Sequence, residues 1–262
     1  MSTPYTDQNE TGEAQTLISH LVELRVCLLR SLYSVIILFF LLFYFSNDLY
    51  HAIATPLLER LPPGSSMIAT EVASPFLAPF KLTFFVALYL AMPYILYQAW
   101  RFVAPGLYAT EKRFMLPLII TSVLLFYTGT AFAFFVVFPL IFAFFTAIAP
   151  EGVMVMTDIN HYLSFILTIF FAFGLSFEIP VATFLLIWSG FITVRELREK
   201  RPYIIVAAFV IGMLLTPPDV MSQILLAVPI WLLFELGLVL SEKFIPGGDT
   251  REDSLPGGNA GS

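Results

Sequence analysis

One carboxylate stands inside the apolar part of the chain. Glu178 lies in Phe177-Glu178-Ile179-Pro180 and separates the uncharged stretches 159–177 and 179–194. An ionisable side chain inside a membrane span is costly, so it is a candidate for function. Pro180 lacks a backbone N–H and favours a kink beside this carboxylate. The alternative is that Glu178 faces a polar concavity and only holds helices together.

Two further acidic candidates lie outside the apolar stretches. Glu23 belongs to Ser19-His20-Leu21-Val22-Glu23-Leu24-Arg25, just before the first apolar run, and Glu111 belongs to the loop 101–113. Each has a simpler structural explanation. Leucines at helical spacing around Glu23 predict an amphipathic entry helix with a solvated charged face. Glu111 follows Thr110, which is a typical N-cap residue, and lies near the positive end of the next helix.

Other kinds of chemistry find little support. The chain has neither a phosphate-binding Gly-x-x-x-x-Gly-Lys-Ser/Thr loop nor a His-Glu-x-x-His zinc motif. One cysteine and three histidines far apart in sequence predict no disulfide within the chain and no metal site. His161 and Ser164 could form only a weak base–nucleophile pair. Glu235 is expected to be an interfacial residue near the end of the last span. We therefore expect that the protein has no catalytic residues, binds no cofactor and is not an enzyme.

The composition indicates a membrane protein. Of 262 residues, 58% are hydrophobic and 12% are charged, and the mean hydropathy is +0.86. Soluble domains carry about 25% charged residues, and half of that cannot coat a globule of this size. The net charge of −6 offers no basic field to bind nucleic acid.

The uncharged stretches predict an all-α integral membrane protein with six transmembrane helices. Eleven of the thirteen lysines and arginines fall in segments that this topology places inside, with both termini cytoplasmic. The stretch 114–150 is counted as one overshooting span, bent or ended by Pro139 and Pro150, because two spans there would separate the basic loops onto opposite sides. The expected spans are 26–46, 76–97, 114–135, 162–187, 203–217 and 221–240.

Segment lengths suggest further organisation. The last two spans are short, since only 17 uncharged residues separate Arg201 from Asp219, whereas a membrane helix needs about 20. A polar N-terminal tail (1–16) precedes the membrane domain (17–244). The Gly-, Pro- and charge-rich tail (245–262) is expected to be disordered.

Four motifs, in order, resemble those of the TatC family, the multispanning receptor subunit of the twin-arginine protein translocase. They are His20-Leu21-x-Glu23-Leu24-Arg25, Phe102-Val103-Ala104-Pro105-Gly106-Leu107-Tyr108-x-x-Glu111-Lys112-Arg113, Ser176-Phe177-Glu178-Ile179-Pro180, and Gly212-Met213-Leu214-Leu215-Thr216-Pro217-Pro218-Asp219. The similarity extends over about residues 17–244. It implies a multi-pass protein of the bacterial inner membrane.

The resemblance also implies a function. Such proteins bind the twin-arginine signal peptides of folded precursors at the cytoplasmic face, work with the single-span partners TatA and TatB, and use the proton gradient. The residues implied in signal-peptide binding are Glu23, Glu111, Arg25 and Phe102. The positions implied in partner binding or transport are Glu178, Pro56, Met213, Asp219 and Gln223. Membrane lipid is a further contact, and self-association is left open.

The chemistry of the acidic pair agrees with this implication. A guanidinium group matches a carboxylate in a bidentate fork and lysine does not, so two glutamates could each bind one arginine. One departure concerns Cys27, which stands where the family commonly has a basic residue. Either that charge is dispensable or Arg30 replaces it. A proton-coupled transporter using Glu178 and an intramembrane hydrolase are the alternatives, but no internal repeat supports the first.

Overall fold

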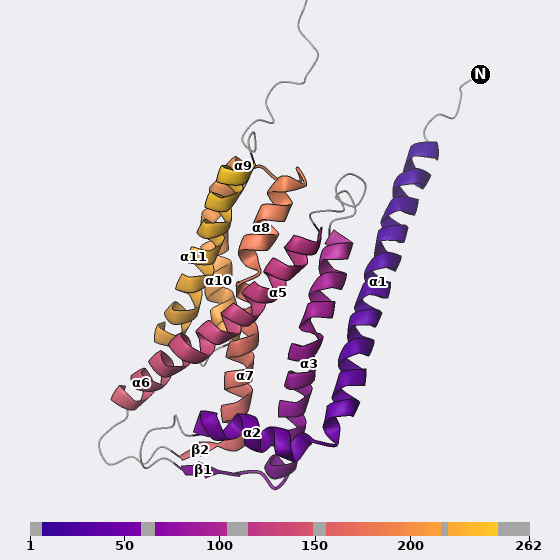
Figure 1. Cartoon of the computed structure of the whole chain (residues 1–262). Helices are drawn as coiled ribbons and strands as arrows, with labels where there is room; N and C mark the ends of the chain where they lie inside the picture. Colours follow the sequence, from indigo (N-terminus) through magenta and orange to yellow (C-terminus); the bar gives the residue numbers. More distant parts are fainter. Residues whose placement is uncertain (1–6, 59–65, 104–114, 149–155, 216–219, 246–262) are drawn as a thin grey trace, which may run out of the picture. The chain divides into compact units, whose positions relative to one another are not determined.

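The computed structural model describes residues 7–58, 66–103, 115–148, 156–215 and 220–245. Helices dominate these residues, together with two three-residue strands (Figure 1). The all-α membrane architecture is confirmed, with one shorter apolar helix at Arg201–Leu215 and five helices long and apolar enough to cross a membrane: His20–Phe43, Ser74–Val103, Leu116–Phe145, Ile159–Trp188 and Gln223–Phe244. The chain divides into two compact units, Met1–Pro56 with Pro75–Ile119, and Leu57–Ser74 with Ile120–Ser262.

The first unit is built on α1 (Asp7–Phe43) and α3 (Ser74–Val103), with α2 (Ser46–Leu58) following α1. α1 and α3 run antiparallel (Figure 1). Near the end of α1, the Phe39 ring packs edge-to-face on Phe80 and Phe84 of α3, with ring centroids 5.0 and 6.1 Å apart. α1 already begins at Asp7, inside the segment 1–16 that the sequence suggested as a polar tail.

The third span is one long helical run, as the charge argument required. It consists of α5 (Met115–Phe132), a π-helical turn η1 (Ala133–Val137) and α6 (Phe138–Ile148). The wide turn directly precedes Pro139, whose ring clashes with the carbonyl four residues earlier in a regular helix. The expected bend at Pro139 therefore takes the form of a π turn, and the helix continues well beyond the expected end at 135.

The fourth span breaks at its carboxylate. α7 (Ile159–Ser176) ends where the Phe177 N–H donates to the Phe173 carbonyl, and α8 (Ile179–Trp188) begins after Glu178. Pro180 lies in the first turn of α8, where its missing N–H costs no helical hydrogen bond. The prediction of a single span that carries a carboxylate and is interrupted beside it is thus confirmed.

The remaining helices are α9 (Val194–Glu199), α10 (Arg201–Leu215) and α11 (Val220–Phe244). α10 is short, as expected, at 15 residues, or about 22 Å of helix. α11 is longer than the expected span and has 25 residues. Beyond Ile245, the expected disordered tail lies outside the described residues. A buried core joins the third and fourth spans to the last hairpin through Ala133, Val137, Ile141, Ile169, Phe173, Ala208, Leu226, Ala227 and Ile230.

A polar clamp precedes α7. The strand β1 (Ser66–Ile68) pairs in parallel with β2 (Met156–Asp158). Asp158 caps α7 by accepting from the backbone N–H groups of Asn160 and His161, and its other oxygen accepts from the N–H and hydroxyl of Thr70. These hydrogen bonds, led by the Thr70 hydroxyl, hold the pKa of the Asp158 carboxyl well below its usual range. Asp158 therefore stays ionised, and its hydrogen bonds to Thr70 and to the start of α7 persist, at any physiological pH.

Candidate functional site

An aromatic contact brings the first motif to the end of α3. The His20 ring stacks on Phe102 with centroids 4.3 Å apart and an interplanar angle of 23°. His20 begins the candidate span of α1, and Phe102 is the next-to-last residue of α3. Glu23 lies one turn after His20 and is exposed. The stacking therefore holds Glu23 near the point where the chain leaves α3 and enters the segment that contains Glu111.

Three of the four residues implied in signal-peptide binding, Glu23, Arg25 and Phe102, lie in the part of the chain that the structure describes. Arg25 is exposed and lies two positions after Glu23, so the two side chains point to different faces of α1. Glu111 lies outside the described residues. Glu23 forms no ion pair within the described part of the chain. The half-buried Cys27 is one turn further along, where a lysine would pair with Glu23. The cysteine therefore leaves Glu23 without a basic neighbour at this position of α1.

Glu178 is buried at the break between α7 and α8. Its side chain does not cap α8, and the residue is 8% exposed. Neither carboxyl oxygen has a hydrogen-bond partner of good geometry among the described residues. The polar group that acts on them is the hydroxyl of Ser122, which is fully buried on α5. A carboxyl with so little compensation costs folding free energy and is a candidate for function.

The remaining partner candidates lie at the hairpin between α10 and α11, apart from Pro56, which lies in α2. Gln223 donates from Nε2 to the Phe209 carbonyl at 2.9 Å and so ties α11 to α10. Met213 is 57% exposed on α10. Asp219 lies outside the described residues. Gln223 thus has a structural role beside any role with partners, whereas Met213 is open to contact.

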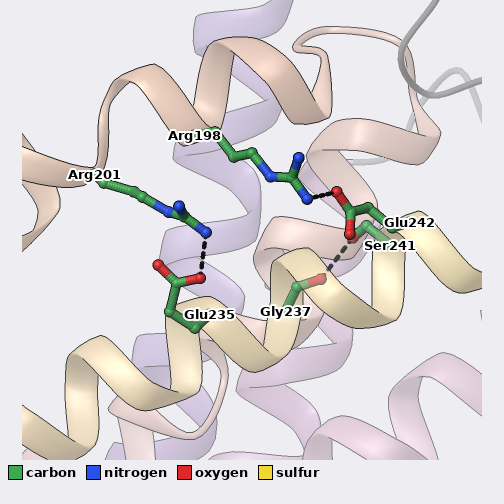
Figure 2. A network of polar contacts seen from close by, with 6 residues as sticks. All are labelled: Arg198, Arg201, Glu235, Gly237, Ser241 and Glu242. Carbon is green, nitrogen blue, oxygen red and sulfur yellow. Dashed lines mark hydrogen bonds and ion pairs between the residues drawn. The ribbon is translucent and has the colours of Figure 1, made fainter.

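Sequence reasoning missed two ion pairs at the other end of this hairpin. Arg201 donates to Glu235 at 2.6 Å, and Arg198 pairs with Glu242 (Figure 2). Glu235 and Glu242 are seven residues apart and so share a face of α11, which is the signal that could have revealed the pairing. Figure 2 also shows the Ser241 hydroxyl donating to the Gly237 carbonyl, a bond of 2.7 Å within the same helix. Glu235 is therefore part of a helix-to-helix contact and not a plain interfacial residue.

We expect Arg201→Ala to lower the free energy of unfolding by about 1–2 kcal/mol. This loss lies between those expected for a fully exposed ion pair and for a buried ion pair. The side chains of Arg201 and Glu235 are 42% and 23% exposed, so solvent screens the pair only in part. Denaturant unfolding in detergent micelles measures the change. The control is Arg195→Ala, whose pair with Glu199 is 73% and 70% exposed. Equal losses in both variants would contradict the prediction.

Ser164, the nucleophile of the hydrolase alternative, has a hydrogen-bond partner within its own helix. The Ser164 hydroxyl donates to the Asn160 carbonyl at 2.5 Å, within the first turns of α7. Within the described ranges, no group of three or more His, Cys, Asp or Glu side chains could hold a metal ion.

The long apolar helices and the buried carboxyl define a multi-pass α-helical membrane protein. A sequence profile described as Sec-independent protein translocase protein (TatC) matches residues 19–229. A TatC from Azotobacter chroococcum mcd 1 is 59% identical over 238 residues, covering 91% of this chain and 93% of that one. A TatC from Escherichia coli K12 is 56% identical over 241 residues, covering 92% and 93%.

Solved structures agree with these relatives. A crystal structure described as the twin arginine translocase receptor TatC superposes with a TM-score of 0.78 at 37% identity, covering 86% of this chain and 98% of that one. The chain belongs to the TatC family and is a component of the Sec-independent, twin-arginine protein translocase. Its role is in protein transport and not in catalysis of a reaction.

Proposed function

We propose that this chain is the receptor subunit that binds twin-arginine signal peptides of folded precursors at the cytoplasmic face. Glu23 and Glu111 each bind one guanidinium group. The observation that carries the proposal is the stacking of His20 on Phe102, which joins the Glu23 motif on α1 to the end of α3. The description of the related crystal structure as a translocase receptor supports the same role.

The charge pattern explains why this site is selective. Two carboxylates at one site on the cytoplasmic face would attract the two guanidinium groups of a twin-arginine peptide. Charge-assisted hydrogen bonds to a planar guanidinium are bidentate, whereas lysine offers only a point charge. Arg25 lies on another face of α1 and contributes to the local field, and the Phe102 ring supports His20.

A second set of positions serves assembly in this proposal. Glu178, Pro56, Met213, Asp219 and Gln223 contact the single-span subunits TatA and TatB, or act in the transport step driven by the proton gradient. The buried carboxyl of Glu178 supports this, because a polar group on an entering helix would give its oxygens the well-formed hydrogen bond that they lack among the described residues. The exposed Met213 supports a contact at the α10–α11 hairpin.

Site-specific photocrosslinking in native membranes tests the proposal. Probes at positions 23 and 111 should crosslink to a twin-arginine precursor, and probes at 213 and 223 should crosslink to the single-span subunits. The control position is Glu199, an exposed glutamate paired with Arg195 on the short helix α9. Precursor crosslinks that are equally strong at 23, 111 and 199 would count against the receptor site.

A further inference from the structure

α5 and α7 approach each other through two reciprocal pairs of glycine and phenylalanine. A Cβ added at Gly129 of α5 would lie 2.5 Å from the Phe173 carbonyl oxygen and 2.8 Å from the Phe177 ring. A Cβ added at Gly174 of α7 would lie 2.5–2.9 Å from the Phe126 ring of α5. Real Cβ atoms essentially never approach other atoms this closely, so any larger residue at these two positions would force its neighbours to shift.

The Gly129 contact falls on the atoms that end α7. The Phe173 carbonyl accepts the N–H of Phe177 at 3.0 Å, and this bond closes the helix just before Glu178. A substituent at Gly129 would push on that oxygen and on the ring of the residue preceding Glu178. Since a carbonyl in a helix cannot rotate away as a side chain can, the strain would pass into the break that holds Glu178.

The same face of α5 carries the polar partner of this carboxyl. Ser122, Phe126 and Gly129 recur at spacings of four and three residues, so they lie in one row along the helix. Ser122 and Phe126 are fully buried. The helices are antiparallel, so Gly129 meets Phe173 and Phe177 while Ser122, two turns earlier on α5, reaches Glu178. The two glycine contacts therefore fix the register that brings the hydroxyl to the carboxyl.

We propose that Gly129 and Gly174 are positioning residues that set the register of α5 against α7 and so hold the Glu178 carboxyl against Ser122. Their importance for transport rests on the proposed role of Glu178. The two positions differ in one testable way. The clash at Gly174 involves only a side chain and can be relieved by a smaller residue at 126. The clash at Gly129 involves backbone and cannot be relieved in this way.

The test is labelling of Glu178 by the hydrophobic reagent dicyclohexylcarbodiimide, followed by mass spectrometry on the purified full chain in micelles. We expect Gly174→Ala to raise the labelling rate about fivefold or more. An overpacking cost of about 1 kcal/mol increases by that factor the population of molecules in which the carboxyl is displaced from Ser122. Gly174→Ala with Phe126→Leu should return it to within about twofold of the parent, since volume is restored. Gly129→Ala should raise labelling and should not be rescued by Phe126→Leu.

Controls separate position from general damage. Gly212→Ala is matched, because the added Cβ lies 3.2 Å from the flexible Gln223 Cγ, and it should label like the parent. Glu178→Gln should abolish labelling at this site. Parent-like labelling of Gly174→Ala, or failure of Phe126→Leu to rescue it, would overturn the inference. If Gly129→Ala does not fold, the Gly174 pair decides alone.

The labelling result is independent of the transport role. If labelling follows the expected pattern while Glu178→Gln transports normally, the positioning inference stands and the proposed role of Glu178 fails. If Glu178→Gln blocks transport while labelling is unchanged in the glycine variants, the proposed role stands and the positioning inference fails.

Discussion

The double variant Glu23→Ala with Glu111→Ala should bind a twin-arginine signal peptide at least about 100-fold more weakly than the parent. Each hydrogen bond to a charged partner contributes about 1.5–3 kcal/mol, so loss of two costs about 3 kcal/mol or more. Glu23 is exposed and has no ion pair in the described part of the chain, so its removal leaves no unpaired partner within that part and little effect on stability. Fluorescence anisotropy of a labelled peptide with the protein in lipid nanodiscs measures the affinity.

A thermodynamic cycle makes this prediction specific. A peptide with two lysines in place of the arginines should bind the parent weakly, because lysine cannot form the bidentate fork. In the double variant the arginine and lysine peptides should bind alike, since the groups that distinguish them are gone. Glu199→Ala is the matched control and should retain the preference for arginine. A preference that persists in the double variant would place the receptor elsewhere.

The spans could be predicted because hydropathy and charge are properties of consecutive residues. The basic residues of two loops forced an even number of spans between them, and this correctly gave one span for α5, η1 and α6. The break at Glu178 also followed from local sequence, since a carboxylate and Pro180 stand together in an apolar run. Such features require no knowledge of which helix packs on which.

Contacts between distant segments could not be predicted in this way. The charged end of α11 is held by Arg198 and Arg201, which pair with Glu242 and Glu235. The Asp158 clamp depends on Thr70, which is 88 residues away in the chain. Asp158 could have been recognised as a helix N-cap, but its second partner could not.

The site shows the same division. The motifs named Glu23, Phe102 and Glu178, but only the fold shows that His20 stacks on Phe102 and that Ser122 faces the buried carboxyl. Glycines at 129 and 174 carry no signal in the sequence, because a glycine that is required for close packing looks like any other. Their meaning comes from the atoms that a Cβ would meet.

Glu178→Met should abolish transport while leaving the free energy of unfolding unchanged or raising it by up to about 2 kcal/mol. Glu178 is 8% exposed and its carboxyl oxygens have no hydrogen bond of good geometry among the described residues, so burying this group costs folding free energy with little compensation. Methionine fills a similar volume without polar oxygens. Transport of a folded precursor into membrane vesicles and denaturant unfolding in micelles measure the two effects.

The opposite signs of these effects separate a functional carboxyl from a structural one. If Glu178 only held helices together, its removal would lower stability, and transport would fall as a consequence. Ser176→Ala is the matched control, because Ser176 is equally buried but donates to the Ala172 carbonyl within its own helix, and it should transport normally. Signal-peptide binding should persist in Glu178→Met, because Glu23 and Glu111 are unchanged. Normal transport by Glu178→Met would show that the carboxyl has no role in transport, and a clear loss of stability would show that it is structural.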